Sequence, residues 1–350
     1  MSWTAHVFTL GLLSSLAYST PSLAAAAAQL ETRSFTIPSV DPGIELYMRN
    51  KHPAGMTTFS ADRTLLFVHG ATYPAETAFD LPIEGVSMMD LIAQQGYDVF
   101  LVDIRGYGGS TRPPEMDQPP AANKPLATSA DAAKDLGAAV DYVLKTRGIS
   151  KLDLMGWSWG TSTAGSYTSL HDEKINRLVL YAPLWLREPP VAPKGDPLGA
   201  YRTVGKDSAK ARWLKGVAED KAATLIPPGV FDAWWNATLA TDPVGSKLNP
   251  PMLRAPNGVV EESTDYWLAG KPYYDPGKIT VPTLLIHAEW DADLPTYQAE
   301  AYFKQLTNVP YKRFVELGEG THTVMLEKNR MQFFREIIGF LSESDPLALR

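Results

Sequence analysis

Residues 156–160 read Gly-Trp-Ser-Trp-Gly and lie between an apolar, strand-like run at 151–155 and a helix-like run at 161–170. A serine at a sharp strand-to-helix turn exposes its hydroxyl as a nucleophile, and glycines two positions to either side allow the strained bend. The pattern therefore predicts a nucleophile elbow centred on Ser158.

The sequence around the elbow alternates between strand-like and helix-like runs, which predicts an α/β fold with a mostly parallel sheet flanked by helices. Short, continuously apolar runs are typical of central strands buried on both faces. Strands are expected at 64–69, 97–104, 151–155, 177–181, 281–287 and 311–316. An antiparallel pair turned at Asp41-Pro42-Gly43 is expected over 33–48, and helices are expected at 129–147, with Ser129 as the N-cap, at 161–170, 294–306 and 331–342.

The alternation breaks between residues 184 and 278, which are rich in proline and hold five of the nine tryptophans. We interpret this segment as an inserted, mainly helical cap between the two parts of the core, 31–183 and 279–350. Aromatic side chains in such a cap can form an apolar pocket above the active site, although packing against the core would also explain each of them. The candidates in or beside this segment are Trp185, Trp234, Trp235 and Trp267.

The N-terminus is typical of a secretory signal peptide. Residues 1–30 contain no charged side chain, and an apolar core at 7–18 is followed by Pro21 and by small residues at 24–28. We therefore expect residues 1–28 to be removed and the protein to be secreted or periplasmic. An uncleaved apolar N-terminus or a membrane anchor is the alternative, because only His6, and no Lys or Arg, precedes the apolar core.

Composition excludes several classes of function. The formal net charge of −7 comes without a Lys/Arg cluster, which argues against nucleic-acid binding. The absence of cysteine excludes disulfides, thiolate nucleophiles and thiolate metal sites, and the six histidines show no metal-ligand spacing. We expect neither a metal nor another cofactor, and the sequence assigns no oligomeric state.

Four further segments accompany the elbow: His69-Gly70 after a buried strand, the loop 103–110, the segment 282–295, and Gly320-Thr321-His322. With these, the chain resembles the α/β-hydrolase fold superfamily. The resemblance implies a catalytic triad in the chain order serine, acid, histidine.

By this resemblance Ser158 is the nucleophile, His322 is the general base and Asp291 is the acid that orients the histidine. The acid position follows from Ala288-Glu289-Trp290-Asp291, in which Ala288 replaces the glycine of many relatives. Asp293 and Glu289 remain alternatives for the acid.

The resemblance also implies an oxyanion hole made by the backbone N–H groups of Trp159 and Ala71, with Thr72 as the alternative to Ala71. Trp157 and Trp159 flank the serine, which favours a small-molecule substrate with an apolar or aromatic acyl or alcohol group.

We therefore expect a serine hydrolase that cleaves a carboxylic ester or a related acyl bond. An amide hydrolase of the proline-iminopeptidase type is an alternative that requires acidic cap residues, for which the candidates are Glu188, Glu219, Glu261, Glu262 and Asp265. A non-catalytic ligand-binding module on the same fold is a further alternative. Epoxide hydrolases and dehalogenases of this fold have an aspartate at the elbow, so Ser158 argues against both.

Overall fold

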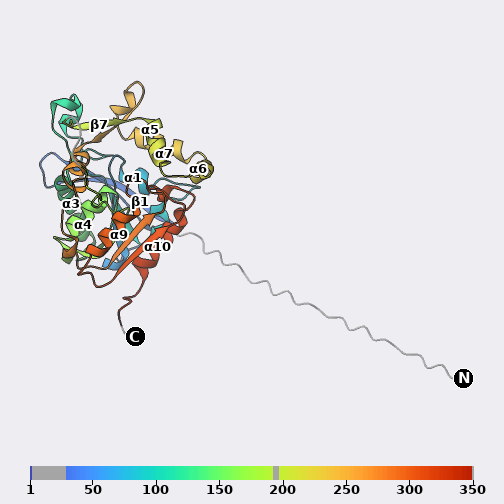
Figure 1. Ribbon diagram of the computed structural model, residues 1–350. Coiled ribbons are helices and arrows are strands. Elements are labelled where there is room, and N and C mark those ends of the chain that lie inside the picture. The colour runs from blue at the N-terminus through green and yellow to red at the C-terminus, as the bar shows by residue number, and fades with distance from the viewer. Residues whose placement is uncertain (2–28, 192–196, 349–350) are drawn as a thin grey trace.

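The computed structural model describes residue 1, residues 29–191 and residues 197–348. The expected leader therefore lies outside the described residues, apart from Met1. An eight-stranded sheet forms the centre of the molecule in the order β1-β2-β4-β3-β5-β6-β9-β10 (Figure 1). Its strands are β1 Leu30–Pro38, β2 Glu45–Pro53, β3 Thr64–Val68, β4 Asp98–Val102, β5 Leu152–Trp157, β6 Ile175–Tyr181, β9 Thr283–Ala288 and β10 Lys312–Leu317.

Strands β4, β3, β5, β6, β9 and β10 pair in parallel, whereas β1 and β2 form an antiparallel hairpin whose second strand joins β4. The expected α/β fold is thus confirmed. The apolar runs form central strands because the sheet is covered on both faces: Leu65 and Phe67 of β3 pack into one hydrophobic cluster, and Leu66 and Val68 pack into the other.

Helices α1 Ala75–Phe79, α2 Met88–Ala93 and α10 Arg330–Ser342 contribute to the first cluster. Helices α3 Ser129–Arg147, α4 Trp159–Thr168 and α9 Thr296–Gln305 contribute to the second. Successive side chains along each strand therefore pack alternately into two hydrophobic cores, one on each face of the sheet. Short 3₁₀ turns lie at Ala61–Arg63, Pro114–Asp117, Pro120–Ala122, Asp172–Lys174, Gly245–Lys247, Pro276–Lys278 and Val324–Leu326.

The N-terminus of α3 differs by one residue from the expectation. Thr128, not Ser129, is the N-cap, and its side chain exchanges hydrogen bonds with Asp131 in a capping box. The hydroxyl of Ser129 is instead buried, donating to Glu262 and accepting from the indole of Trp159. The helix ends at Gly148, whose φ of 65° is the left-handed conformation that favours glycine.

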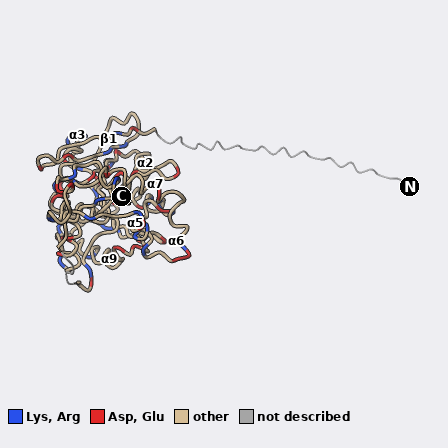
Figure 2. The backbone as a smooth tube through the Cα atoms, turned by 90° about the horizontal axis from the view of Figure 1, so that it is seen from above, with Lys and Arg blue, Asp and Glu red and all other residues tan. Residues whose placement is uncertain are grey.

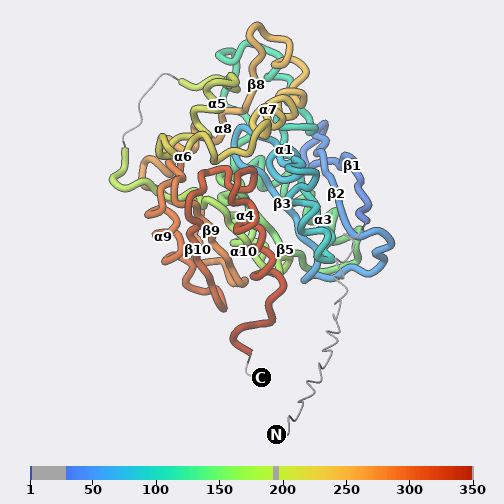
Figure 3. Tube along the Cα trace, turned by 90° about the vertical axis from the view of Figure 1, so that its right-hand side faces the viewer, coloured from blue at the N-terminus to red at the C-terminus, as the bar shows by residue number. Residues whose placement is uncertain are grey.

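The segment between β6 and β9 contains helices α5 Lys206–Trp213, α6 Glu219–Leu225, α7 Val230–Ala240 and α8 Gly258–Glu262, and a π-helical turn at Ser263–Trp267. It also contains an antiparallel strand pair, β7 Tyr201–Val204 with β8 Leu253–Pro256, which the sequence pattern did not reveal. Figure 3 shows α5, α6, α7 and β8 gathered above one end of the sheet. The loops that follow the strands and carry the candidate site residues lie at this end.

In the view of Figure 2, Lys and Arg are interspersed with Asp and Glu over the described chain. In the described part of the chain, the helices are all too short or too polar to cross a bilayer.

Candidate active site

Ser158 lies at the turn between β5 and α4 with φ 56° and ψ −123°, a conformation that a non-glycine residue rarely adopts. The neighbouring glycines are required by packing. A Cβ on Gly160 would lie 2.5 Å from the carbonyl oxygen of His69, and a Cβ on Gly156 would lie 2.3 Å from the carbonyl oxygen of Gly160. The two glycines therefore permit the elbow, because α4 lies closer to the strands at these positions than a side chain would allow.

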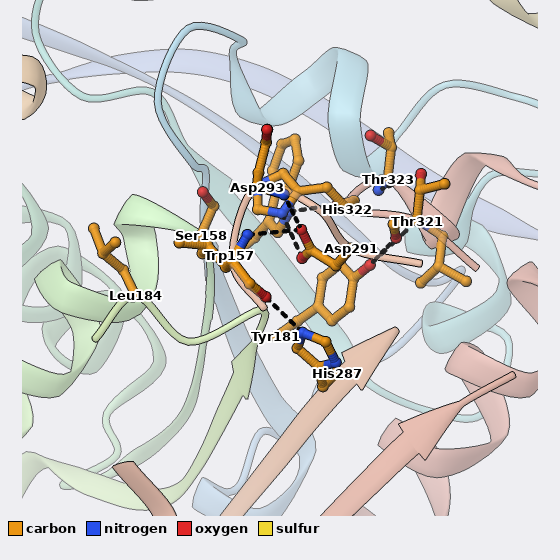
Figure 4. A network of polar contacts seen from close by, with 12 residues as sticks. Trp157, Ser158, Tyr181, Leu184, His287, Asp291, Asp293, Thr321, His322 and Thr323 are labelled. Atoms are coloured by element: carbon orange, nitrogen blue, oxygen red, sulfur yellow. Dashed lines mark hydrogen bonds and ion pairs between the residues drawn. The ribbon is translucent and has the colours of Figure 1, made fainter. Parts of the chain in front are cut away.

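His322 follows β10 on a loop and faces the carboxylate of Asp291, which follows β9 (Figure 4). The Nδ1 atom of His322 lies 2.7 Å from Oδ2 of Asp291. The other carboxylate oxygen of Asp291 accepts from the backbone N–H groups of Asp293 and Leu294, each at 3.0 Å. Backbone donors thus fix the buried carboxylate, and the carboxylate orients the imidazole.

The loop that carries His322 is fixed by two side chains from strands β5 and β6 and by Glu327, which lies five residues further along the same loop. The indole Nε1 of Trp157 donates to the carbonyl of His322 at 2.9 Å, and the hydroxyl of Tyr181 donates to the carbonyl of Thr321 at 2.6 Å. The carboxylate of Glu327 accepts from the backbone N–H of Thr321 at 3.0 Å, from the Thr321 hydroxyl, and from Trp213 Nε1 of the cap at 2.8 Å. Glu327 was not predicted from the sequence, because its role depends on the folded loop and on the contact with Trp213, which is distant in the chain.

The two alternative acids have other partners. Asp293 lies 2.5 Å from Nε of Arg212 and 3.3 Å from Nζ of Lys215. Burial raises the pKa of Asp293, but the neighbouring positive charges, chiefly that of Arg212, and the hydrogen bond from Arg212 together outweigh burial, so the pKa is lowered overall. Glu289 accepts from the backbone N–H of Glu319 at 2.8 Å. Of the three candidate acids, only Asp291 is hydrogen-bonded to His322.

A cavity of about 320 Å³ is lined by Ser158, Trp159, Ala71 and His322, among other residues. Trp159 is the first residue of α4, so its backbone N–H has no acceptor within the helix. Ala71 lies in the turn after β3. The residues of the two expected oxyanion donors, the expected nucleophile and the expected base therefore line the same cavity.

Among the hydrogen bonds of the described residues, none joins Ser158 Oγ to His322. In the absence of substrate the contact between nucleophile and base is often long, and it shortens when the substrate binds. The two side chains share the cavity wall, with Ser158 on the elbow and His322 on the opposite loop (Figure 4).

Two other histidines are structural. His69 is buried with Nδ1 2.6 Å from the carbonyl of Gly70 and Nε2 3.0 Å from the backbone nitrogen of Ile104. Since the backbone N–H must donate to Nε2, the proton of the neutral ring resides on Nδ1. Burial lowers the pKa of His69 to about 4. His287 is likewise buried and lies 2.7 Å from the carbonyl of Leu294 through Nε2.

The expected substrate-binding tryptophans divide into two groups. Trp157 and Trp234 line a second, smaller cavity of about 20 Å³ that also touches His322. Trp185, Trp235 and Trp267 are buried in the hydrophobic clusters and do not line either cavity beside His322. Hydrophobicity alone does not separate a lining tryptophan from a packed one. The walls of the smaller cavity also include residues that were not predicted to bind substrate, namely Tyr73, Ala209, Arg212, Trp213 and Thr323, together with Ala71 and Asp293.

In the described ranges, no group of three or more His, Cys, Asp or Glu side chains could hold a metal ion. The charged cap residues that line the larger cavity are Arg202 and Arg212.

Similarity to curated proteins covers parts of the chain. A probable lipase of Schizosaccharomyces pombe is 33% identical over 111 residues, which is 31% of this chain and 22% of the lipase. Epoxide hydrolase 3 of Siraitia grosvenorii is 25% identical over 185 residues, which is 51% of this chain and 54% of that protein. The chain therefore spans about a fifth of the first relative and about half of the second.

The fold is shared with solved structures. A serine hydrolase from Cycloclasticus zankles, a bacterium that degrades polyaromatic hydrocarbons, superposes with a TM-score of 0.59 at 17% identity over 89% of this chain and 100% of its own. The sequence model for the alpha/beta hydrolase fold matches residues 63–329, which include the elbow, Asp291 and His322. Because this match covers well over half of the chain, the protein belongs to the α/β-hydrolase fold family.

Proposed function

We propose that the protein is a cofactor-independent serine hydrolase that cleaves a carboxylic ester through an acyl-enzyme. One observation carries the proposal: the hydrogen bond of 2.7 Å between Asp291 and His322, beside a cavity that Ser158 also lines. A serine hydroxyl is a weak nucleophile until a base takes its proton, and these three side chains are of the type and chain order that supply that base.

In the proposed reaction, Ser158 Oγ attacks the ester carbonyl while its proton passes to His322 Nε2. The backbone N–H groups of Trp159 and Ala71 donate to the oxyanion of the tetrahedral intermediate. The imidazolium then gives its proton to the leaving alkoxide, so that an alcohol departs and an acyl-serine ester remains. Water, deprotonated by His322, attacks this ester, and the carboxylic acid leaves as the proton returns to Ser158.

The smaller cavity supports an apolar group on one side of the scissile bond. Its walls include the aromatic side chains Tyr73, Trp157, Trp213 and Trp234 beside the Arg212–Asp293 ion pair, and its space of about 20 Å³ is close to that of one water-sized group. The aromatic part of this lining fits the apolar group expected from the sequence, and the volume favours a short alkyl group over an aromatic ring.

No specific observation favours the amide alternative. An aminopeptidase-like site needs acidic cap residues facing the substrate amine, and of the five acidic candidates none lines either cavity beside His322. Glu262, the most buried of them, accepts from the backbone N–H of Ser129 at 2.8 Å and from its hydroxyl.

Export is part of the proposal and rests on the sequence of residues 1–30. Protein recovered outside the cytoplasm is expected to begin between Ala25 and Glu31, since signal peptidase cleaves after small residues that follow the apolar core. Detection of Met1 on that material by N-terminal sequencing would favour an anchor instead.

Turnover of a panel of p-nitrophenyl esters and anilides tests the proposed chemistry. The wild type is expected to hydrolyse short-chain esters faster than the matched anilides, and Ser158→Ala is expected to lower kcat by roughly 10³-fold or more without unfolding. Undiminished ester turnover by folded Ser158→Ala would refute the role of Ser158, and a preference for anilides would move the assignment to amide bonds.

A further inference from the structure

Two arginines of the cap reach the larger cavity, and their electrostatic surroundings differ. Arg212 of α5 is paired with Asp293, which also binds Lys215, so its charge is compensated within the protein. Arg202 of β7 lines the same cavity as Ser158 and His322. Within the described residues, no carboxylate lies within ion-pair distance of Arg202.

Among the described residues, the hydrogen-bond partners of Arg202 are all neutral. Its Nη1 atom donates to the carbonyl of Pro256 at 2.6 Å and to the amide oxygen of Asn257 at 3.3 Å. Its Nη2 atom donates to the hydroxyl of Thr72 at 2.6 Å. A guanidinium carries five N–H donors, so these three bonds leave donors available for a ligand.

Arg202 is half-buried, and burial together with the nearby Arg212 charge lowers its pKa. A guanidinium nonetheless stays protonated at neutral pH. Holding a positive charge in a partly desolvated place without a counterion is costly, and such a charge forms strong hydrogen bonds with an anion that enters.

We propose that Arg202 binds a carboxylate carried by the substrate, so that the enzyme prefers esters with an anionic group on one side of the scissile bond and a short apolar group on the other. This inference rests on the proposed function and deepens it. The scissile carbonyl would lie at Ser158, between the aromatic cavity and the cavity that contains the guanidinium.

Arg202 also has a structural role that the test must separate from charge recognition. Its bond to Thr72, which has φ 81°, holds the turn next to the expected oxyanion donor Ala71. Loss of this bond would slow every substrate to a similar extent. Recognition of a carboxylate would instead change the ratio between an anionic substrate and its neutral partner.

Two matched substrate pairs measure that ratio. 4-Acetoxybenzoate and 4-acetoxybenzamide place the charge on the alcohol side, whereas monoethyl glutarate and ethyl 4-carbamoylbutanoate place it on the acyl side, and each substrate has a short alkyl group on the other side of its one ester bond. We expect the wild type to prefer the anionic member of at least one pair in kcat/KM, and added salt to reduce this preference by screening.

In Arg202→Gln, the ratio of kcat/KM for the anionic over the neutral member should fall roughly ten- to hundredfold, the usual loss for a hydrogen bond to a charged group. Arg202→Lys keeps the positive charge but loses the planar guanidinium that can bind a carboxylate through two N–H groups. This variant should retain part of the preference for the anionic substrate. Arg187→Gln removes an exposed cap arginine and serves as the control that should leave the ratio unchanged.

The outcomes separate the two proposals. If the wild type hydrolyses neither pair, the proposed ester hydrolysis fails. If it hydrolyses the neutral esters but disfavours both anionic ones, or if Arg202→Gln slows both members equally, the carboxylate site is overturned while the hydrolase stands. If Arg202→Gln does not fold, the wild-type ratio, its salt dependence and the Arg202→Lys ratio still decide the question.

Discussion

Asp291 and Asp293 are two residues apart in the chain, yet they have different partners. Asp291 accepts the Nδ1 proton of His322 at 2.7 Å, whereas Asp293 pairs with Arg212 and Lys215. In Asp291→Asn the amide favours the wrong imidazole tautomer, and kcat for a short ester should fall roughly 10³- to 10⁴-fold. Asp293→Asn, which keeps the shape of the side chain, should lower kcat less than about tenfold. Steady-state kinetics that rank the two variants in the reverse order would reassign the acid.

The buried side chain of His69 makes the free energy of unfolding depend on pH. Burial lowers its pKa from 6.5 to about 4, so the folded protein binds fewer protons at this site than the unfolded chain between these values. His69 therefore stabilises the fold above pH 6.5, and this contribution of roughly 3 kcal/mol is lost as the pH falls towards 4.

In His69→Gln, the free energy of unfolding should be lower at pH 7 and should decrease less steeply between pH 6.5 and 4 than in the wild type. Urea titrations at a series of pH values measure both quantities. His171→Gln, at a side chain 42% exposed, is the matched control for replacing a histidine outside the core. An unchanged slope in His69→Gln would mean that His69 is not a buried, neutral histidine.

At the scale of elements, the elbow depends on how closely α4 approaches β3. A Cβ on Gly160 would lie 2.5 Å from the His69 carbonyl oxygen and 2.6 Å from that of Val68, and backbone atoms cannot move aside as a flexible side chain can. Gly160→Ala should therefore lower the free energy of unfolding by about 2 kcal/mol or more.

The control for this substitution lies in α10. Gly339 is exposed, and a Cβ added to it would meet no atom within 4 Å apart from its chain neighbours and the backbone of its own helix, so Gly339→Ala should raise the free energy of unfolding by about 1 kcal/mol through helix propensity. Denaturant unfolding of both variants checks the pair. Equal stability of Gly160→Ala and the wild type would show that the elbow tolerates a side chain at this position.

The elements also show what a sequence pattern can predict. Strands β3 to β6 and β9 were predicted because burial on both faces leaves an unbroken apolar run. The pair β7 and β8 was missed because β7, Tyr-Arg-Thr-Val, is short and half exposed, without such a run. Glu289, Asp291 and Asp293 lie in one loop and differ in their hydrogen-bond partners. The sequence therefore narrowed the catalytic acid to these three residues, and the hydrogen bond to His322 distinguished Asp291.

For the whole molecule, the question is how the cap completes the site. Trp234 and Trp235 are adjacent on α7, but only Trp234 lines the small cavity beside His322. Their indoles are nearly equally buried, at 2% and 3% exposed, so composition and burial could not have distinguished them. Arg202 was missed for a similar reason, since only the folded structure shows that it lines the cavity and that its hydrogen-bond partners within the described ranges are neutral.

Trp234→Ala should enlarge the small cavity and shift preference towards longer acyl or alkyl chains, since each additional buried methylene is worth about 0.8 kcal/mol, or roughly fourfold in kcat/KM. Trp235→Ala should lower Tm and leave the chain-length preference unchanged. Initial rates on p-nitrophenyl esters from acetate to octanoate distinguish the two. If both variants only lower Tm, the cap does not set chain length.

The central claim is that Ser158 is the nucleophile of a serine hydrolase, and covalent labelling tests it most directly. The wild type, incubated with a fluorophosphonate and digested, should give one modified peptide in tandem mass spectrometry, with the added mass on Ser158 and loss of ester turnover in proportion to labelling. Ser158→Ala should remain unlabelled while folded. Labelling at another residue, or full ester turnover after stoichiometric labelling of Ser158, would contradict the claim.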